Sequence, residues 1–216
     1  MNKGAIMTYT EYVMMYTEYV MNLLTRHERG MPIYSDEITD AVADEFKLNR
    51  KQAAAATAVA IKRIMDRSEL PDLRCYQKGI YYRTAMTPFG ELGINREALV
   101  AHKYLSSDNG YESGLRLLHY MGLTTQMPAE HLVVTNAAKD CLRYDHRLGV
   151  SICPPKTPIT AENKAYLQIL DVLNLLDKAP VDVQDPYAIV AEHIRKTHLQ
   201  YERLLYYAER LCMEKN

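Results

Sequence analysis

The chain has 216 residues, of which 48% are apolar and 25% are charged. This composition is typical of a globular protein and excludes a chain that is disordered throughout. The 26 basic and 27 acidic side chains leave a net charge of −1. That balance excludes a protein that binds nucleic acid by being basic all over, but it permits a local basic face. Tyrosine is the main aromatic residue, with 17 copies against two phenylalanines and no tryptophan.

The sequence contains no recognisable targeting, membrane-spanning or catalytic segment. The N-terminal residues lack a continuous apolar stretch, and no segment approaches the ~20 apolar residues of a membrane span, so we expect a cytoplasmic protein that does not contact a membrane. The phosphate-binding, dinucleotide-binding, serine-hydrolase and zinc-protease motifs are absent, and an enzyme is not expected. We expect no cofactor, no metal and only free thiols at the irregularly spaced Cys75, Cys141, Cys153 and Cys212.

The first predicted element is a helix built from a repeated heptad. Residues 8–14 read TYTEYVM and residues 15–21 read MYTEYVM, with apolar side chains at helical spacing. Gly30 provides a stop. The helix either packs on its own domain or forms a dimer seam, because two heptads alone do not define a coiled coil.

Two more helices are predicted after a short connector at residues 31–34. Ser35 is expected to cap the first of them, and its apolar residues are Ile38, Ala41, Val42 and Phe46. Asn49 starts the second, since Gln52 three residues later completes a capping box. That helix is expected to extend to about residue 70 and to place Ala60, Ile61 and Ile64 in the core.

Residues 73–83 are predicted to form a β-hairpin with its turn at Lys78-Gly79. Three helices followed by a hairpin is the order of a winged helix-turn-helix domain. We therefore expect such a domain at residues 1–86.

Residues 87–216 are predicted to form a second domain, and the whole chain is predicted to be α+β. A small mixed α/β part is expected up to residue 158, with helices at 96–105, capped by Asn95, and at 111–121. Strands are expected at 131–135 and within 142–152. A helical hairpin over 159–216 follows, with one helix capped by Thr160 and a single last helix over 186–212, capped by Asp185.

The basic side chains concentrate in residues 47–83, which hold nine of them and only three acids. This excess coincides with the third helix and the hairpin, the elements that contact DNA grooves and phosphates in a winged helix. Asn and Gln can read adenine edges and Arg can read guanine. A solvated basic face, with Asn49 acting only as a helix cap, is the alternative. The predicted DNA-binding residues are Asn49, Arg50, Lys51, Gln52, Lys62, Arg63, Arg74, Tyr76, Gln77 and Lys78.

Several short motifs, in a fixed order and spacing, carry a resemblance to a known family. They are Lys78-Gly79-Ile80-Tyr81, Thr87-Pro88-Phe89-Gly90-Glu91, Gly110-Tyr111-x-Ser113-Gly114, Leu123-Thr124-Thr125-Gln126-Met127-Pro128 and Val133-Val134-Thr135-Asn136. Over residues 8–176 the chain resembles the AbiEi-type antitoxins of bacterial type IV toxin–antitoxin and phage-defence systems. The last helix, over 186–212, has no counterpart in that pattern.

The resemblance implies a protein that is not an enzyme. Its winged helix would bind operator DNA and repress its own operon. Its C-terminal part would oppose a nucleotidyltransferase-like toxin without forming a tight complex. The alternative is a winged-helix subunit used only for protein interaction, with the tyrosine-rich first and last helices as contact surfaces. Both a monomer and a homodimer fit the sequence.

Overall fold

The computed structural model describes residues 9–106 and 108–213, and the chain divides into two compact units, Met1–Ala98 and Leu99–Asn216. Thr8 of the heptad repeat and the side chain of Cys212 lie outside the described residues. Both units combine helices and strands, which confirms the α+β class. The division falls later than the expected boundary after residue 86, because residues 84–95 bond back to the first unit: the Asn95 N–H donates to the Gly30 carbonyl at 2.7 Å.

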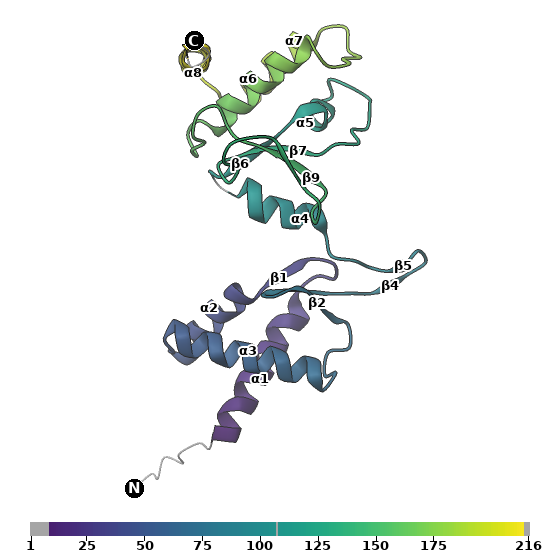
Figure 1. Ribbon diagram of the computed structural model, residues 1–216, viewed down its shortest axis with the longest axis vertical. Helices are drawn as coiled ribbons and strands as arrows, with labels where there is room; N and C mark the ends of the chain where they lie inside the picture. The colour runs from purple at the N-terminus through teal and green to yellow at the C-terminus, as the bar shows by residue number, and fades with distance from the viewer. Residues whose placement is uncertain (1–8, 107, 214–216) are drawn as a thin grey trace. The chain divides into compact units, whose positions relative to one another are not determined.

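The first unit packs three helices against a small antiparallel sheet (Figure 1). The strand order is β1-β3-β2. The core lies where α1, α2 and α3 meet, around Val20, Leu24 and Ile64. The elements are α1 (Tyr9–Arg26), β1 (Pro32–Tyr34), α2 (Ser35–Phe46), α3 (Arg50–Asp66), β2 (Leu73–Gln77) and β3 (Ile80–Arg83).

The structure corrects three predictions in this unit. Residues 31–34 are not a connector, because β1 pairs with β3 and places Ile33 opposite Tyr81. Ser35 is the first residue of α2 rather than its cap, and its N–H donates to the Gly79 carbonyl at 2.9 Å. The third helix ends at Asp66 instead of near residue 70, because Ser68 takes a positive φ of 53°. A strand of three residues is too short to show an alternating pattern in the sequence.

The capping box at the start of α3 is confirmed. The Gln52 N–H donates to Asn49 Oδ1 at 2.9 Å, and the Asn49 N–H donates to Gln52 Oε1 at 3.3 Å. Lys47, at φ 53°, ends α2 just before it. Together these contacts fix the tight turn between α2 and α3 and so set the direction of α3 relative to α2.

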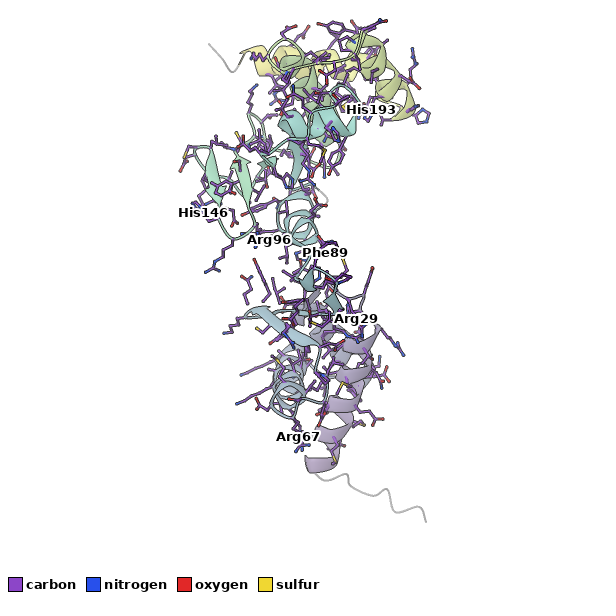
Figure 2. All side chains as sticks on the ribbon, turned by 90° about the vertical axis from the view of Figure 1, so that its right-hand side faces the viewer. Arg29, Arg67, Phe89, Arg96, His146 and His193 are labelled. Carbon is purple, nitrogen blue, oxygen red and sulfur yellow. The ribbon has the colours of Figure 1, made fainter. Side chains whose placement is uncertain are left out.

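A second, shorter hairpin follows the sheet, formed by β4 (Met86–Thr87) and β5 (Gly90–Glu91). Its tip carries Phe89, whose side chain is completely exposed (Figure 2). Thr84 Oγ1 donates to the Leu92 carbonyl at 2.8 Å at the base of the hairpin.

The second unit is built on a four-stranded mixed sheet of order β6-β7-β9-β8, in which β7 and β9 run parallel. The helix α4 (Arg96–Val100), which spans the division of the chain, continues into a π-helical turn at Ala101–Leu105. The remaining elements are β6 (Gly110–Ser113), α5 (Gly114–Tyr120), β7 (Leu132–Thr135), β8 (Arg143–Asp145), β9 (Val150–Cys153), α6 (Lys164–Leu176), α7 (Pro186–Lys196) and α8 (Tyr201–Met213).

Alternating side chains of β7 join the sheet to helices on both of its faces. Val133 packs with Val100 and Tyr104 on the α4 side, whereas Val134 packs with Leu167 on the α6 side. This is the period of two that a strand imposes. The sheet is therefore enclosed between α4 and α6 (Figure 1).

Three expectations for the second unit are also corrected. The helix expected at 111–121 is the strand β6 followed by α5, because Gly114 turns the chain at φ 71°. Thr160 does not cap α6, which begins after Asn163. The last helix is broken at residues 197–200, where His198 has a φ of 54°. The predicted strands at 131–135 and within 142–152 are confirmed, as are the caps Asn95 and Asp185.

Candidate nucleic-acid interface

The helix α3 has a buried face and a basic outer face. Ala53, Thr57, Ala60, Ile61 and Ile64 are buried. We define the outer face of α3 by its exposed residues Lys51, Ala54, Ala55, Ala58 and Lys62. The spacing of Lys51, Ala54, Ala58 and Lys62 places them on one side of a helix. The two lysines are eleven positions apart, which corresponds to about 16 Å along the helix axis.

The two lysines of the outer face are not engaged elsewhere. Neither Lys51 nor Lys62 has a hydrogen bond or ion pair within the part of the chain that the structure describes. Only methyl groups and backbone lie between them along the face, and residues 51–62 contain no acid. The outer face can therefore approach a flat or grooved anionic surface closely, with one cation at each end.

The predicted site residues in the first turn of α3 have structural roles of their own. Asn49 and Gln52 are both engaged in the capping box. Arg50 lies 3.8 Å from Asp40, with both side chains exposed, so this pair contributes little to stability. Arg63 is half-buried and faces the α1 side, where it lines a hollow with Met14 and Met21. Of the predicted residues on α3, Lys51 and Lys62 are the most accessible to a partner.

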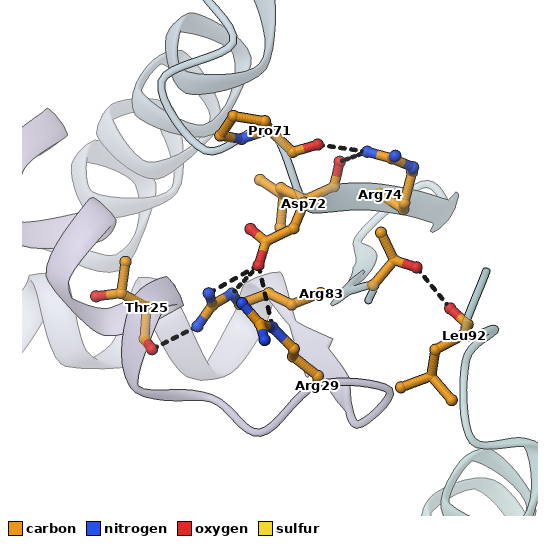
Figure 3. Close-up of polar contacts among 9 residues, drawn as sticks. Thr25, Arg29, Pro71, Asp72, Arg74, Arg83 and Leu92 are labelled. Carbon is orange, nitrogen blue, oxygen red and sulfur yellow. Dashed lines mark hydrogen bonds and ion pairs between the residues drawn. The ribbon is translucent and has the colours of Figure 1, made fainter. Parts of the chain in front are cut away.

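Arg74 is held in place by contacts within the unit (Figure 3). Its Nε and Nη2 atoms donate to Glu91 Oε1 at 3.0 and 2.8 Å, and Nη1 donates to the carbonyls of Pro71 and Leu73. These contacts tie β2 to β5. A phosphate contact by Arg74 would require it to leave three acceptors, Glu91 Oε1 and the carbonyls of Pro71 and Leu73.

A partly buried ion cluster next to Arg74 uses two more arginines (Figure 3). Asp72 Oδ2 accepts from Arg83 at 2.8 and 3.1 Å and lies 3.4 Å from Arg29 Nε. Burial alone would raise the pKa of Asp72, but the two guanidinium groups outweigh it and hold that pKa below its usual range. Arg83 also donates to the Thr25 carbonyl at 2.6 Å. The cluster therefore joins the end of α1 to the sheet.

The turn between β2 and β3 lies beside an acidic helix. Gln77 and Lys78 are exposed there, and the register shifts by one residue around Tyr76. The turn is bonded to the start of α2 through Ser35. That helix exposes Asp36, Glu37, Asp40, Asp44 and Glu45. The acids lower the local positive potential around Lys78, so the outer face of α3 remains the clearest basic surface.

An apolar groove lies between α1 and α3. It has a volume of about 320 Å³ and is lined mainly by Val13, Tyr16, Leu48, Ala56 and Val59. Val59 is 47% exposed, and Tyr12 on the neighbouring turn of α1 is 41% exposed. Tyr16 and Tyr19 pack edge-on against Phe46. The second heptad therefore packs on the core of its own unit, where Val20 is buried.

Comparison with known proteins does not place the chain in a family. No family model matches it, and a search of curated proteins finds no match. In residues 9–106 and 108–213, His, Cys, Asp and Glu side chains form no group that could hold a metal ion. Within the same described ranges, no helix has both the length and the apolar character of a bilayer span.

Sequence reasoning missed the alanines of the outer face as part of the site. Ala54, Ala55 and Ala58 point away from the core and are exposed, but they were not among the predicted DNA-binding residues. Their helical spacing from Lys51 and Lys62 is the signal that would have identified them.

Figure 2 shows Arg67 and Arg29 at opposite ends of the first unit, so the arginines of this unit do not form one patch.

Proposed function

We propose that the first unit is a winged helix-turn-helix domain that binds double-stranded DNA through the outer face of α3. The element order and the strand order β1-β3-β2 support this assignment. The observation that carries the proposal is the pair of free lysines, Lys51 and Lys62, separated by small residues on one exposed helical face.

The dimensions of the outer face suit the major groove of DNA. The groove is about 12 Å wide, and the two lysines stand about 16 Å apart along the helix. A lysine at each end can neutralise a phosphate on each side of the groove. The intervening alanines let the helix backbone approach the base edges, and their methyl groups can contact thymine methyls.

The residues of the outer face of α3 also limit the sequence specificity of DNA binding. Phosphate contacts supply affinity, while base contacts supply specificity. Asn49 and Gln52 already serve the cap, and the outer face has no other side chain that makes paired hydrogen bonds to a base. We therefore expect binding that depends steeply on salt and discriminates moderately among sequences.

The resemblance to AbiEi-type antitoxins supports a biological role for this activity. On that basis, the DNA is the operator upstream of the protein's own gene, and binding represses the operon. The second unit then counteracts a nucleotidyltransferase-type toxin without being an enzyme itself. A nucleotidyltransferase-like reading frame directly downstream, whose toxicity this protein suppresses on co-expression, would support the role. Unchanged growth arrest on co-expression would contradict it.

A mobility-shift titration with the upstream DNA tests the DNA-binding part directly. The full chain should shift this DNA at low salt, and Lys51→Ala should weaken the shift. Lys178→Ala is a matched control, because Lys178 is an exposed lysine of the second unit. Absence of a shift at low salt would contradict the proposal.

A protein-interaction subunit is the second candidate function, and the apolar groove between α1 and α3 favours it. The groove and the exposed Val59 offer an apolar surface that DNA would not need. In this case the chain should form a stable complex with a defined partner and fail to shift DNA. Val59→Asp should then abolish that complex without changing the thermal stability of the free chain.

A further inference from the structure

The second unit contains a small cavity that is separate from the candidate DNA interface. It lies between β6, β7, the end of β9 and α6, and has a volume of about 150 Å³. Taking about 30 Å³ per water molecule, it has room for roughly five water-sized groups. Its polar side chains are Tyr111, Ser113, Cys153, Lys156, Thr157 and Asp171.

Asp171 is the central polar group of this cavity. Its Oδ2 atom accepts hydrogen bonds from Tyr111 Oη and Ser113 Oγ, both at 3.1 Å. Its Oδ1 atom has no hydrogen-bond partner among the described residues. Burial raises the pKa of Asp171 in spite of the two hydroxyl donors and the charge of Lys156. One carboxylate oxygen is thus held by the protein and the other is left for a ligand.

Three of the other polar side chains, Tyr111, Ser113 and Cys153, offer only acceptors to a ligand, because their protons are already used. Tyr111 and Ser113 donate their hydroxyl protons to Asp171, which leaves only lone pairs on their oxygens. The Cys153 thiol donates to the Pro154 carbonyl. A ligand that satisfies these groups must bring several donors of its own. A protonated amine has three donors and a positive charge that matches Asp171.

The other walls of the cavity set the shape of the rest of the ligand. Leu132, Val134, Leu167 and Leu211 supply apolar contacts. Lys156, in the loop after β9, is exposed and has no ion-pair partner in the described part of the chain. A negative group on the ligand could therefore pair with Lys156 while the amine contacts Asp171.

We propose that this cavity binds a small amino acid, with its ammonium group on Asp171 Oδ1 and its carboxylate next to Lys156. Asp171, Ser113 and Tyr111 select the amine, and the cavity volume restricts the side chain to a small one. The proposal does not depend on DNA binding by the first unit.

Calorimetric and NMR titrations of the full chain with three probes test the site: L-alanine, propylammonium and propionate. L-Alanine should bind saturably, and at least threefold more tightly than propylammonium. Propionate should not bind. Backbone amide shifts should concentrate in β6, the end of β9 and α6. No saturable binding of either amine, or propionate binding as tightly as L-alanine, would overturn the proposal.

Variants separate the two contacts. Asp171→Asn should weaken the binding of both amines at least tenfold, and Lys156→Ala should weaken only that of L-alanine. Since Asp171→Asn could disturb folding, Thr157→Phe provides a second test: this loop residue lines the cavity and is only half-buried. Its larger side chain should block both amines while the chain stays folded. Unchanged binding in folded Asp171→Asn or Thr157→Phe protein would overturn the assignment.

Discussion

Replacing Asp145 by asparagine removes a carboxylate that joins three segments of the second unit. Asp145 Oδ2 accepts from Lys103 Nζ at 2.9 Å and from Tyr104 Oη at 2.8 Å, on the π-helical turn after α4. Its Oδ1 accepts from the backbone N–H groups of Arg147 and Leu148. Burial opposes ionisation, but these bonds outweigh it and lower the pKa of Asp145 from 3.8 to about 2. This decrease corresponds to about 2 kcal/mol of stability at neutral pH.

The stability contributed by Asp145 depends on pH, and the direction of its pKa shift determines how. Because the folded-state pKa lies below the unfolded value, the stabilisation is present above pH 3.8 and is lost as the pH falls toward 2. Asp145→Asn should therefore lower the free energy of unfolding by about 2 kcal/mol at pH 7, or about 4–8 °C in Tm. At pH 3 the deficit should shrink to roughly 1 kcal/mol, because the wild-type carboxylate has lost about half of its contribution.

Urea denaturation of both proteins at pH 7, 5 and 3 measures the two deficits. Asp140→Asn is the matched control, because Asp140 is exposed and has no partner among the described residues. Its stability should equal that of the wild type at each pH. An Asp145→Asn deficit that is the same at pH 7 and pH 3 would refute the account of how Asp145 is stabilised.

Three further substitutions test the close packing at Gly110, the helix cap at Asn49 and the ion cluster around Asp72. In Gly110→Ala, the new Cβ would collide with the Tyr104 carbonyl and lie 2.6 Å from the Val134 carbonyl. Thermal unfolding should therefore show a loss of about 3 kcal/mol in the free energy of unfolding. The control Gly93→Ala, with open space around the new Cβ, should be nearly neutral. Asn49→Ala should cost about 1 kcal/mol in urea unfolding because it removes a helix cap, whereas Asn49→Asp should retain the cap; equal losses in both would contradict the capping role. Arg83→Met leaves Asp72 with one fewer guanidinium and should cost about 2 kcal/mol by thermal denaturation. Arg67→Met, which breaks an exposed 3.6 Å pair, should cost less than about 0.5 kcal/mol. A similar cost for the two would argue against a stabilising role of the partly buried cluster around Asp72.

Local sequence signals predicted the elements whose determinants lie close together in the chain. The capping box of Asn49 and Gln52, the hairpin turn at Lys78-Gly79 and the Asp185-Pro186 helix start depend on residues within a few positions of one another. The break between α7 and α8 was missed for the opposite reason. Both helices pack against α6, with Val190 and Leu204 buried in the same core, so apolar residues recur across the break.

The distribution of charge in the sequence predicted which segment contains the candidate DNA interface, but not which of its basic side chains are free to bind DNA. The basic excess of residues 47–83 pointed to α3 and the hairpin, yet contacts between distant residues decide which cations are available. Arg74 pairs with Glu91, and Arg83 reaches Thr25 of α1. Periodicity and composition contain no information on such pairs, so the sequence could not separate Lys51 and Lys62 from the arginines used in structure.

Several of the 17 tyrosines have an identifiable structural role. Tyr16 and Tyr19 pack on Phe46, and Tyr104 and Tyr111 donate to the partly buried carboxylates of Asp145 and Asp171. Tyr166 Oη accepts from the Gln200 N–H at 3.2 Å, which anchors the turn before α8. An apolar ring with a polar tip suits positions where a helix meets a polar group at the edge of a core.

The salt dependence of DNA binding tests the central claim most directly. Fluorescence anisotropy with labelled upstream DNA would be measured over a range of salt concentrations for the wild type and for the Lys51→Ala/Lys62→Ala double variant. The wild type should bind with a steep dependence on salt, and the double variant should bind more weakly with a slope smaller by about 2, since each lysine neutralises one phosphate. Absence of wild-type binding at low salt, or an unchanged slope in the double variant, would contradict a DNA interface on the outer face of α3.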